Sequence, residues 1–196
     1  MNLRSLLKAY EPLSVSGSLD RPVETVVSDS RLACAGAVFV AIRGGQEQDR
    51  HAFVEDAVAR GAEAIIVEDA RSEALGATCI VVNDSRRALA RLSARIHGDP
   101  AKDLLCVGVT GTNGKSTTAS IISRVLHSDA EPSAYLGTLG FQCGGQIEPI
   151  PNTTPEAGQL QALLARARDA GCRSMSMEVS SHGLSLDRVF GIDFAA

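Results

Sequence analysis

The run Val107-Gly-Val-Thr-Gly-Thr-Asn-Gly-Lys-Ser-Thr117 joins a short apolar stretch to a segment with helical character. A buried strand, a glycine-rich turn and a helix N-terminus together point several backbone N–H groups at one anion. In such a loop, glycines let the backbone approach phosphates, the lysine neutralises β- and γ-phosphate charge, and the first hydroxyl is a ligand for Mg²⁺. The pattern therefore predicts a loop that binds the polyphosphate of ATP. Its residues are Gly111, Thr112, Asn113, Gly114, Lys115, Ser116 and Thr117.

The glycine spacing of this loop differs from the common phosphate-binding pattern. That pattern needs a glycine where this chain has Val109, whereas the glycines stand at Gly108 and Gly111. An ordinary glycine-rich turn between a strand and a helix is the alternative. The lysine and the two hydroxyls that enter the helix directly after the turn favour phosphate binding.

Around this loop the chain alternates between strand and helix patterns, which indicates a parallel sheet. The stretch Gly140–Ile150 is typical of a hairpin because it alternates around two glycines. The predicted strands are 104–109, 133–138 and 173–179, and the predicted helices are 115–127 and 155–170.

The first half of the chain predicts a smaller α/β unit. Its expected strands are 23–27, 37–42, 64–67 and 79–82, and its expected helices are 2–10, 51–60 and 85–97. Ser28–Arg31 is the expected turn between the first two strands, and Gly98–Asp103 has the glycine, proline and charge content of a linker. We therefore expect an α/β fold with two domains. They are a small N-terminal domain at 1–98 and the first part of a mostly parallel ATP-binding domain at 104–196.

The composition excludes several classes of protein. The 196 residues carry 19 Lys and Arg against 23 Asp and Glu without any run of like charges, which argues against nucleic-acid and membrane-surface partners. No signal peptide or long apolar segment is recognisable, so a cytoplasmic location is expected. The five cysteines lack metal-ligand spacing and are expected to be buried thiols. The chain stops inside an apolar run, Phe194–Ala196, which we interpret as truncation of a longer protein.

Glu178 follows an apolar strand, where a carboxylate is costly to bury without a cation or hydrogen-bond donors. Ligand sites in open parallel sheets lie at the carboxyl ends of strands, and both Ser116 and Glu178 fall there. The two are therefore candidates to share one magnesium ion. The alternatives are an ion pair of Glu178 with Arg173 or Arg188, or exposure at a sheet edge.

Two further polar stretches have local explanations. Thr154 is a suitable N-cap for a helix with Pro155 at its first position. Ser180 is similarly suited to cap a short helix, and a lone histidine such as His182 is more often structural than catalytic.

The loop variant Gly111–Thr117 resembles the ATP loop of the Mur ligases and of their folylpolyglutamate synthetase relatives. Asn152-Thr-Thr154 and Met177-Glu-Val-Ser-Ser-His-Gly-Leu184 resemble motifs of the UDP-N-acetylmuramoyl-tripeptide synthetase branch, the MurE type. Ser28-Asp-Ser-Arg31 extends the resemblance into the first unit, so that it covers essentially the whole chain.

This resemblance implies an ADP-forming ligase that adds the third amino acid, meso-diaminopimelate or L-lysine, to UDP-N-acetylmuramoyl-L-alanyl-D-glutamate during peptidoglycan synthesis. In that family ATP and Mg²⁺ convert the substrate carboxylate to an acyl phosphate, which the incoming amino group attacks, and Lys115 is the expected catalytic residue. In the family, a lysine that becomes carbamylated and a C-terminal domain lie beyond the part matched by this chain. These 196 residues alone are therefore expected to be inactive. The protein is expected to be a monomer.

The resemblance also assigns substrate contacts. Those to the muramoyl peptide would be Asn152, Thr153, Thr154, Ser180 and Arg188, and those to the uridine nucleotide Ser28, Ser30, Gly45, Gln46 and Glu47. Some members have glutamine where this chain has Leu186, so the polar substrate contact of that glutamine is not expected here. His182 receives no defined role.

Three other interpretations remain open at this point. One is a phosphate-loop switch or kinase of another family, which is not expected to combine the loop with Asn-Thr-Thr-Pro and Glu-Val-Ser-Ser-His. A second is another Mur-type ligase or a folylpolyglutamate synthetase relative, the latter having no need of the N-terminal unit. The third is a catalytically silent nucleotide-binding fragment.

Overall fold

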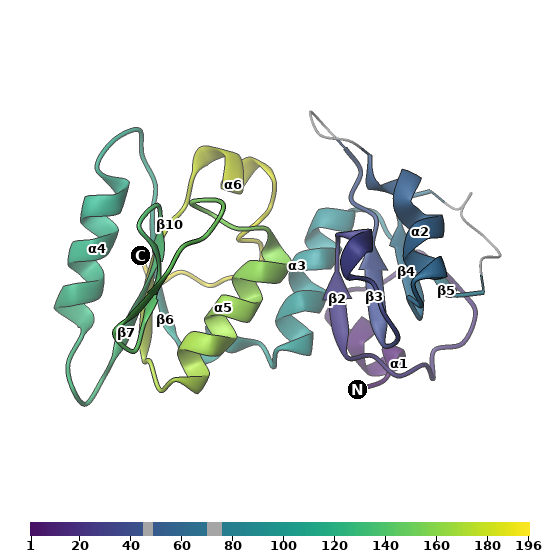
Figure 1. Cartoon of the computed structure of the whole chain (residues 1–196), viewed down its shortest axis with the longest axis horizontal. Coiled ribbons are helices and arrows are strands. Elements are labelled where there is room, and N and C mark those ends of the chain that lie inside the picture. Colours follow the sequence, from purple (N-terminus) through teal and green to yellow (C-terminus); the bar gives the residue numbers. More distant parts are fainter. Residues whose placement is uncertain (45–48, 70–75) are drawn as a thin grey trace. The chain divides into compact units, whose positions relative to one another are not determined.

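The computed structural model describes residues 1–44, 49–69 and 76–196, and they form two compact units (Figure 1). The first unit is Met1–Ile96 and the second is His97–Ala196. The division lies next to the stretch Gly98–Asp103 that was expected to be a linker. This stretch instead belongs to the second unit, where Pro100–Asp103 forms the 3-10 helix η5 and packs against a later helix.

The sheet of the first unit has the strand order β1-β5-β4-β3-β2. The strands are β1 Ser14–Ser16, β2 Thr25–Val27, β3 Ala37–Val40, β4 Ala64–Val67 and β5 Thr78–Val81. Neighbouring strands from β2 to β5 are parallel, whereas β1 pairs with β5 in the antiparallel sense. The sequence did not indicate β1, because its three residues are all exposed and show no apolar alternation.

Helices cover both faces of this first sheet. They are α1 Leu3–Leu6, η1 Leu7–Ala9, η2 Ser30–Leu32, η3 Arg50–Phe53, α2 Val54–Ala59 and α3 Ser85–Ile96. Figure 1 shows α2 and α3 on opposite sides of the sheet. Successive side chains of a strand point to opposite faces, and Phe39 and Ile65 pack with Val54 and Ala57 of α2. Strands β3 and β4 are therefore buried on both faces, which explains their uninterrupted apolar sequence.

The sheet of the second unit has the strand order β6-β10-β7-β8-β9. The strands are β6 Leu105–Val109, β7 Ser133–Gly137, β8 Gly140–Cys143, β9 Gln146–Glu148 and β10 Ser174–Glu178. Strand β10 lies between β6 and β7 and is parallel to both, while β8 and β9 extend the sheet as antiparallel hairpins. The predicted α/β class with a mostly parallel sheet is confirmed.

Two helices sandwich this second sheet (Figure 1). They are α4 Lys115–Leu126 on one face and α5 Ala157–Asp169 on the other, and the short helix α6 Ser181–Ser185 follows β10. Leu160 and Leu164 of α5 pack with Met175 and Met177 of β10. The intervening Ser176 points to the other face, where its hydroxyl donates a hydrogen bond to a carbonyl of α4.

All the helices named above are short. The longest, α5, has 13 residues, and α3 and α4 have 12 each. A helix needs about 20 apolar residues to cross a bilayer. Within the described ranges, no helix combines the length and apolar character needed to do so.

Candidate functional site

The predicted phosphate loop lies between the end of β6 at Val109 and the start of α4 at Lys115. Gly114 is the N-cap of α4 and adopts a left-handed conformation with φ of 79°, which an L side chain rarely tolerates. The first bond of the helix runs from the N–H of Thr118 to the carbonyl of Gly114, at 2.9 Å. The amides of the first turn before it therefore have no partner within the helix and lie at its positive end. This geometry suits a bound phosphate.

Lys115 folds back over the loop that precedes it. Its Nζ donates a hydrogen bond to the carbonyl oxygen of Gly111 at 2.8 Å. The ammonium group consequently lies over the loop next to the N-terminal amides of α4. A phosphate bound there would meet both kinds of donor.

Glu178 lies beside this loop at the end of the neighbouring strand. It is the register partner of Val109 in β6, and its side chain is 1% exposed. Its Oε1 accepts hydrogen bonds from the hydroxyl of Tyr135 at 2.6 Å and from the N–H of Thr138 at 2.8 Å. Its Oε2 accepts one from the hydroxyl of Thr138 at 3.2 Å. Tyr135 within β7 and Thr138 directly after it therefore hold the carboxylate in one orientation.

These donors keep Glu178 ionised despite its burial. Burial raises the pKa of the carboxyl group, but hydrogen bonds from Tyr135, from Thr138 and from the Ser116 hydroxyl outweigh it, so that the pKa lies below its ordinary value. The pKa of the Tyr135 phenol is raised, first by burial and then by the adjacent carboxylate. Glu178 is thus a buried anion that faces the hydroxyl of the phosphate loop.

The alternatives for Glu178 as an ion-pair or edge residue are wrong. Strand β10 is central in the sheet, and Arg188 pairs with Glu156 instead. Within residues 1–44, 49–69 and 76–196, no ion pair involves Glu178. A carboxylate and a hydroxyl are hard oxygen ligands, so Ser116 and Glu178 fit a magnesium ion chemically.

Gly137 makes room for this carboxylate. A Cβ atom added at Gly137 would lie 2.7 Å from the Cδ of Glu178 and would also collide with the phenol oxygen of Tyr135. No L side chain fits there unless Glu178 moves. The glycine at the end of β7 is therefore part of the site.

The segment Asn152–Thr154 also reaches Glu178. The buried Thr154 donates its hydroxyl to the backbone oxygen of Glu178 and accepts the N–H of Ser180, both at 3.0 Å. The hydroxyls of Thr153 and Thr138 lie 3.1 Å apart, and Asn152 is exposed.

The expectation that Thr154 caps a helix is therefore wrong. Helix α5 begins at Ala157, and its N-cap is Glu156, which makes no side-chain capping bond. Pro155 accordingly precedes the helix and is not its first residue. The hydroxyl of Thr154 meets tertiary partners, not the helix end.

The predicted cap at Ser180 is confirmed. Its hydroxyl oxygen accepts the N–H of Gly183 at 3.0 Å and starts α6. Arg188 is 7% exposed and donates to the carbonyl of Thr154 at 2.9 Å, while its Nη2 lies 2.5 Å from Oε1 of Glu156. His182 is exposed on α6. Arg188 and Ser180 thus fasten the Thr154 segment to the end of β10.

The second unit therefore brings together most of the predicted site residues. The phosphate loop, Glu178, the Asn152–Thr154 segment, Ser180 and Arg188 are linked by the contacts given above. Ser28 and Ser30 belong to the first unit. Gly45, Gln46 and Glu47 lie outside the described residues.

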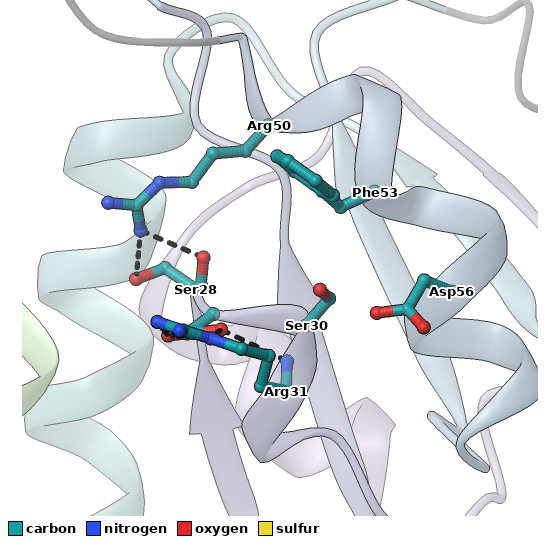
Figure 2. A pocket seen from close by; sticks show the side chains of 7 residues that line it. Ser28, Ser30, Arg31, Arg50, Phe53 and Asp56 are labelled. Carbon is teal, nitrogen blue, oxygen red and sulfur yellow. Dashed lines mark hydrogen bonds and ion pairs between the residues drawn. The ribbon is translucent and has the colours of Figure 1, made fainter.

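The first unit has a cavity of about 420 Å³ at the end of β2 (Figure 2). Its lining residues are Ser28, Asp29, Ser30, Arg31, Arg50, Phe53 and Asp56. Nη1 of Arg50 donates to both the hydroxyl and the carbonyl oxygen of Ser28, each at 2.8 Å. The cavity therefore combines two serine hydroxyls with guanidinium groups and one aromatic ring.

Asp29 and Arg31 form the local pair that the sequence allowed. Oδ1 of Asp29 accepts the N–H of Arg31 at 3.0 Å, and Oδ2 lies 2.6 Å from Nη2 of the same residue. The hydrogen bonds from Arg31 lower the pKa of Asp29 to about 2. Strands β2 and β3 are parallel, so this stretch belongs to a crossover through η2 and not to a tight turn between neighbours.

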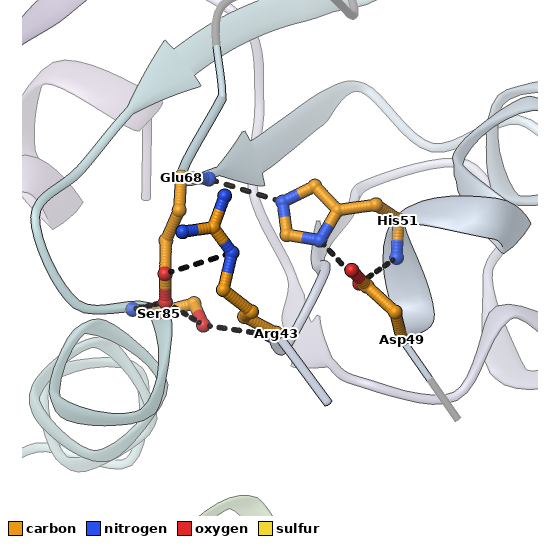
Figure 3. A network of polar contacts seen from close by, with 5 residues as sticks. All are labelled: Arg43, Asp49, His51, Glu68 and Ser85. Atoms are coloured by element: carbon orange, nitrogen blue, oxygen red, sulfur yellow. Dashed lines mark hydrogen bonds and ion pairs between the residues drawn. The ribbon is translucent and has the colours of Figure 1, made fainter. Parts of the chain in front are cut away.

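A polar network lies at the same carboxyl edge of the first sheet (Figure 3). Nδ1 of His51 is 2.7 Å from Oδ1 of Asp49, and Nε2 accepts the backbone N–H of Glu68 at 3.1 Å. Oε1 of Glu68 accepts both the hydroxyl and the N–H of Ser85, and Oε2 lies 3.6 Å from Nε of Arg43. Both ring nitrogens of His51 are thus engaged within the fold. The network connects the segments that follow β3 and β4 to the start of α3.

Several site residues were missed by sequence reasoning. Thr138 stands at the carboxyl end of a predicted parallel strand, and that rule, which selected Glu178, also selects Thr138. Tyr135 lies within an apolar strand and resembles a core residue. Arg50 and Phe53 belong to η3 at the start of the expected helix 51–60, where neither stood out as a site residue.

Comparisons with known proteins place the chain among ligases. The model of the Mur ligase middle domain matches residues 109–196. The UDP-N-acetylmuramoyl-L-alanyl-D-glutamate--2,6-diaminopimelate ligase of Geobacter sulfurreducens is 38% identical over 96% of this chain and 37% of its own length. The corresponding L-lysine ligase of Staphylococcus haemolyticus is also 38% identical, over 99% of this chain and 39% of its own length.

Solved structures give the same relationship. A 2,6-diaminopimelate ligase of the same name superposes with a TM-score of 0.83 at 31% identity, covering 99% of this chain and 39% of the other. The MurF ligase of Thermotoga maritima in complex with ADP superposes with a TM-score of 0.55 at 25% identity, covering 81% of this chain and 32% of the other. Sequence and fold agree over nearly all of these residues, and the chain belongs to the Mur ligase family.

Proposed function

We propose that this chain provides the ATP-binding loop and part of the sugar-nucleotide site of an ADP-forming ligase. The ligase would add meso-diaminopimelate or L-lysine to UDP-N-acetylmuramoyl-L-alanyl-D-glutamate, the substrates in the names of its relatives. The chain spans about 40% of the length of those relatives, so the complete reaction is proposed for the longer protein. The observation that carries the proposal is the position of Glu178. It ends β10, which pairs with β6, and β6 leads into the loop that contains Lys115 and Ser116.

The residues at the sheet edge would position the reacting phosphate. The N-terminal amides of α4 and the Lys115 ammonium would bind the polyphosphate, and Ser116 and Glu178 would hold Mg²⁺. When bound, Mg²⁺ neutralises charge on the transferred phosphate. Because Tyr135 and Thr138 fix the carboxylate beforehand, the site needs little reorganisation when the nucleotide enters. This arrangement suits conversion of a substrate carboxylate to an acyl phosphate, a reaction that depends chiefly on positioning and charge neutralisation.

The muramoyl peptide would bind beside this edge. Asn152 is exposed and Thr153 is half-buried, so their side chains are the available donors and acceptors of the segment. Thr154, Ser180 and Arg188 bond mostly to one another and to β10, and they would contact the substrate through the surface that they hold in place. The reacting carboxylate would thereby be held near the phosphate loop.

The uridine nucleotide would occupy the cavity of the first unit (Figure 2). Ser28 and Ser30 offer hydroxyls to a base edge, and Phe53 offers a ring for packing against the base. Arg31 and Arg50 offer guanidinium groups, which pair well with phosphate. Gly45, Gln46 and Glu47 remain assigned to this site by family resemblance alone.

The test uses the full-length gene product that contains this chain. ADP formation is expected only when UDP-N-acetylmuramoyl-L-alanyl-D-glutamate and a diamino acid are both present, and parallel assays with meso-diaminopimelate and L-lysine identify the third residue. Lys115→Ala is expected to lower kcat by about 10²–10³-fold, because a charge that stabilises the transferred phosphate is lost. Lys102→Ala, an exposed lysine in η5, is the matched control. Unchanged turnover of Lys115→Ala, or equal ADP formation without the muramoyl dipeptide, would refute the proposal.

A further inference from the structure

Two cysteines from distant parts of the second unit lie in contact. Cys143 ends β8, and Cys172 lies in the turn between α5 and β10. Their sulfur atoms are 3.7 Å apart, and both are free thiols. Cys172 is 3% exposed, whereas Cys143 is half-buried and packs at the margin of the core. Cys143 is therefore the less buried of the two residues, and Cys172 lies in contact behind it.

We propose that Cys143 and Cys172 form a reversible disulfide by exchange with a low-molecular-weight disulfide such as oxidised glutathione. This inference is independent of the ligase function. The two sulfur atoms must approach from 3.7 Å to about 2.05 Å, which requires rotation of the two side chains. Each cysteine adjoins a turn glycine, Gly144 or Gly171, around which a Cβ would meet nothing within 4 Å. The turn beside each thiol is thus open on the side where a Cβ would point.

The exchange proceeds in two balanced steps. The Cys143 thiolate attacks one sulfur of oxidised glutathione, the S–S bond of glutathione breaks, and one glutathione thiol leaves. Cys172 then loses its proton to solvent and attacks the sulfur of Cys143, which releases the second glutathione. The protein pair gives up two electrons and two protons, and the small disulfide takes them up as two thiols.

The order of these steps follows from the surroundings of each thiol. Burial, with a smaller contribution from the contact with Cys143, raises the pKa of Cys172 to about 11. Cys172 is therefore a poor nucleophile toward a solute and becomes effective only when a mixed disulfide is held beside it. Cys143 is the less buried partner and reacts first. A pair that stays reduced in a reducing compartment and closes under oxidation is typical of a redox-sensing site.

The cross-link would connect β8 to the amino end of β10, on the side of the sheet away from Glu178. Strand β8 begins three residues after Gly137, and β10 leads from Cys172 to Glu178. The disulfide would close a loop of about 30 residues, a length at which cross-links stabilise the folded state appreciably. Oxidation is therefore expected to make the second unit harder to unfold.

The experiment uses the 196-residue chain with Cys34→Ser, because Cys34 is exposed and would otherwise form its own adducts. The protein is equilibrated with glutathione at defined ratios of oxidised to reduced form, then alkylated, digested with trypsin and analysed by mass spectrometry without reduction. We expect a cross-link between the fragments 125–166 and 169–173. We also expect an increase of about 5 °C in Tm that dithiothreitol reverses.

Two further variants establish the order of attack. Cys172→Ser is expected to retain glutathione on Cys143, and Cys143→Ser is expected to leave Cys172 unmodified. The proposal is wrong if both thiols of the Cys34→Ser protein remain alkylatable at high oxidised glutathione, or if a glutathione adduct on Cys143 persists without the cross-link. The first readout needs no substitution of either cysteine, so misfolding of the variants would not obscure it.

Discussion

Replacing Tyr135 with phenylalanine removes one hydroxyl from a site where a buried carboxylate depends on it. The phenol donates to Oε1 of Glu178 at 2.6 Å, and Tyr135 itself is 1% exposed. Phenylalanine keeps the ring and its packing, so the change isolates the hydrogen bond. A hydrogen bond to an ionised group contributes about 1.5–3 kcal/mol. Thr138 still donates two bonds to the carboxylate, so we expect a loss of about 2 kcal/mol in the free energy of unfolding.

The assay is urea denaturation followed by far-UV circular dichroism, with Tyr10→Phe as the matched control. Tyr10 is the other tyrosine of the chain and lies in the first unit. We expect that control to change the stability of the second unit by less than about 0.5 kcal/mol. A double-mutant cycle of Tyr135→Phe with Glu178→Gln then measures the coupling directly. A coupling energy below about 0.5 kcal/mol would contradict the role assigned to the phenol.

The same interaction predicts a dependence on pH. The folded pKa of Glu178 is below its unfolded value, so the carboxylate stabilises the fold above the unfolded pKa of about 4.3. This contribution is lost as the pH falls through the folded pKa. The stability difference between the parent protein and Tyr135→Phe is therefore expected to be largest near neutral pH and to shrink under acid conditions. A constant difference between pH 7 and pH 3 would argue that the hydroxyl acts through packing alone.

Two other substitutions test the surroundings of the site. Gly137→Ala places a Cβ against the carboxylate of Glu178 and should cost about 1–3 kcal/mol of stability, measured by thermal unfolding. It should also weaken the binding of Mn²⁺, measured by electron paramagnetic resonance. Unaltered metal affinity would show that the position of the carboxylate is unimportant. Arg188→Met leaves Glu156 without its ion-pair partner and should lower the free energy of unfolding, measured by urea denaturation, by about 3 kcal/mol. The control Arg173→Met, at an exposed position, should change it by less than about 0.5 kcal/mol. Equal effects of the two substitutions would be evidence against a specific pair.

The parts of the site that local sequence determines were predictable. The phosphate loop depends on glycines, a lysine and a helix start that are adjacent in the chain, so its pattern can be read directly. Glu178 is a candidate because it ends an apolar strand, where a carboxylate is costly to bury without a cation or hydrogen-bond donors. Thr138 obeys the same rule, but a threonine at a strand end is too common to stand out. The signal was thus strongest where a residue was energetically unusual for its position.

Tertiary partners account for what the sequence could not reveal. Thr154 fits the pattern of an N-cap, yet its hydroxyl bonds to Glu178 and Ser180, more than twenty residues away. Tyr135 has the same difficulty, because its only polar atom finds its partner 43 residues later. Strand β1 forms because it pairs with the edge of β5, and its own three residues show no apolar alternation. In each case the deciding contact is distant in sequence.

The central place of β10 has a consequence for how the chain folds. Strands β6 and β7 form no hydrogen bonds with each other, since β10 lies between them and follows both in the sequence. The sheet therefore closes only when a late segment inserts between two early ones, a long-range step that is slow compared with helix or hairpin formation. Nucleotide affinity would consequently appear late in refolding, after most of the helical signal has been regained.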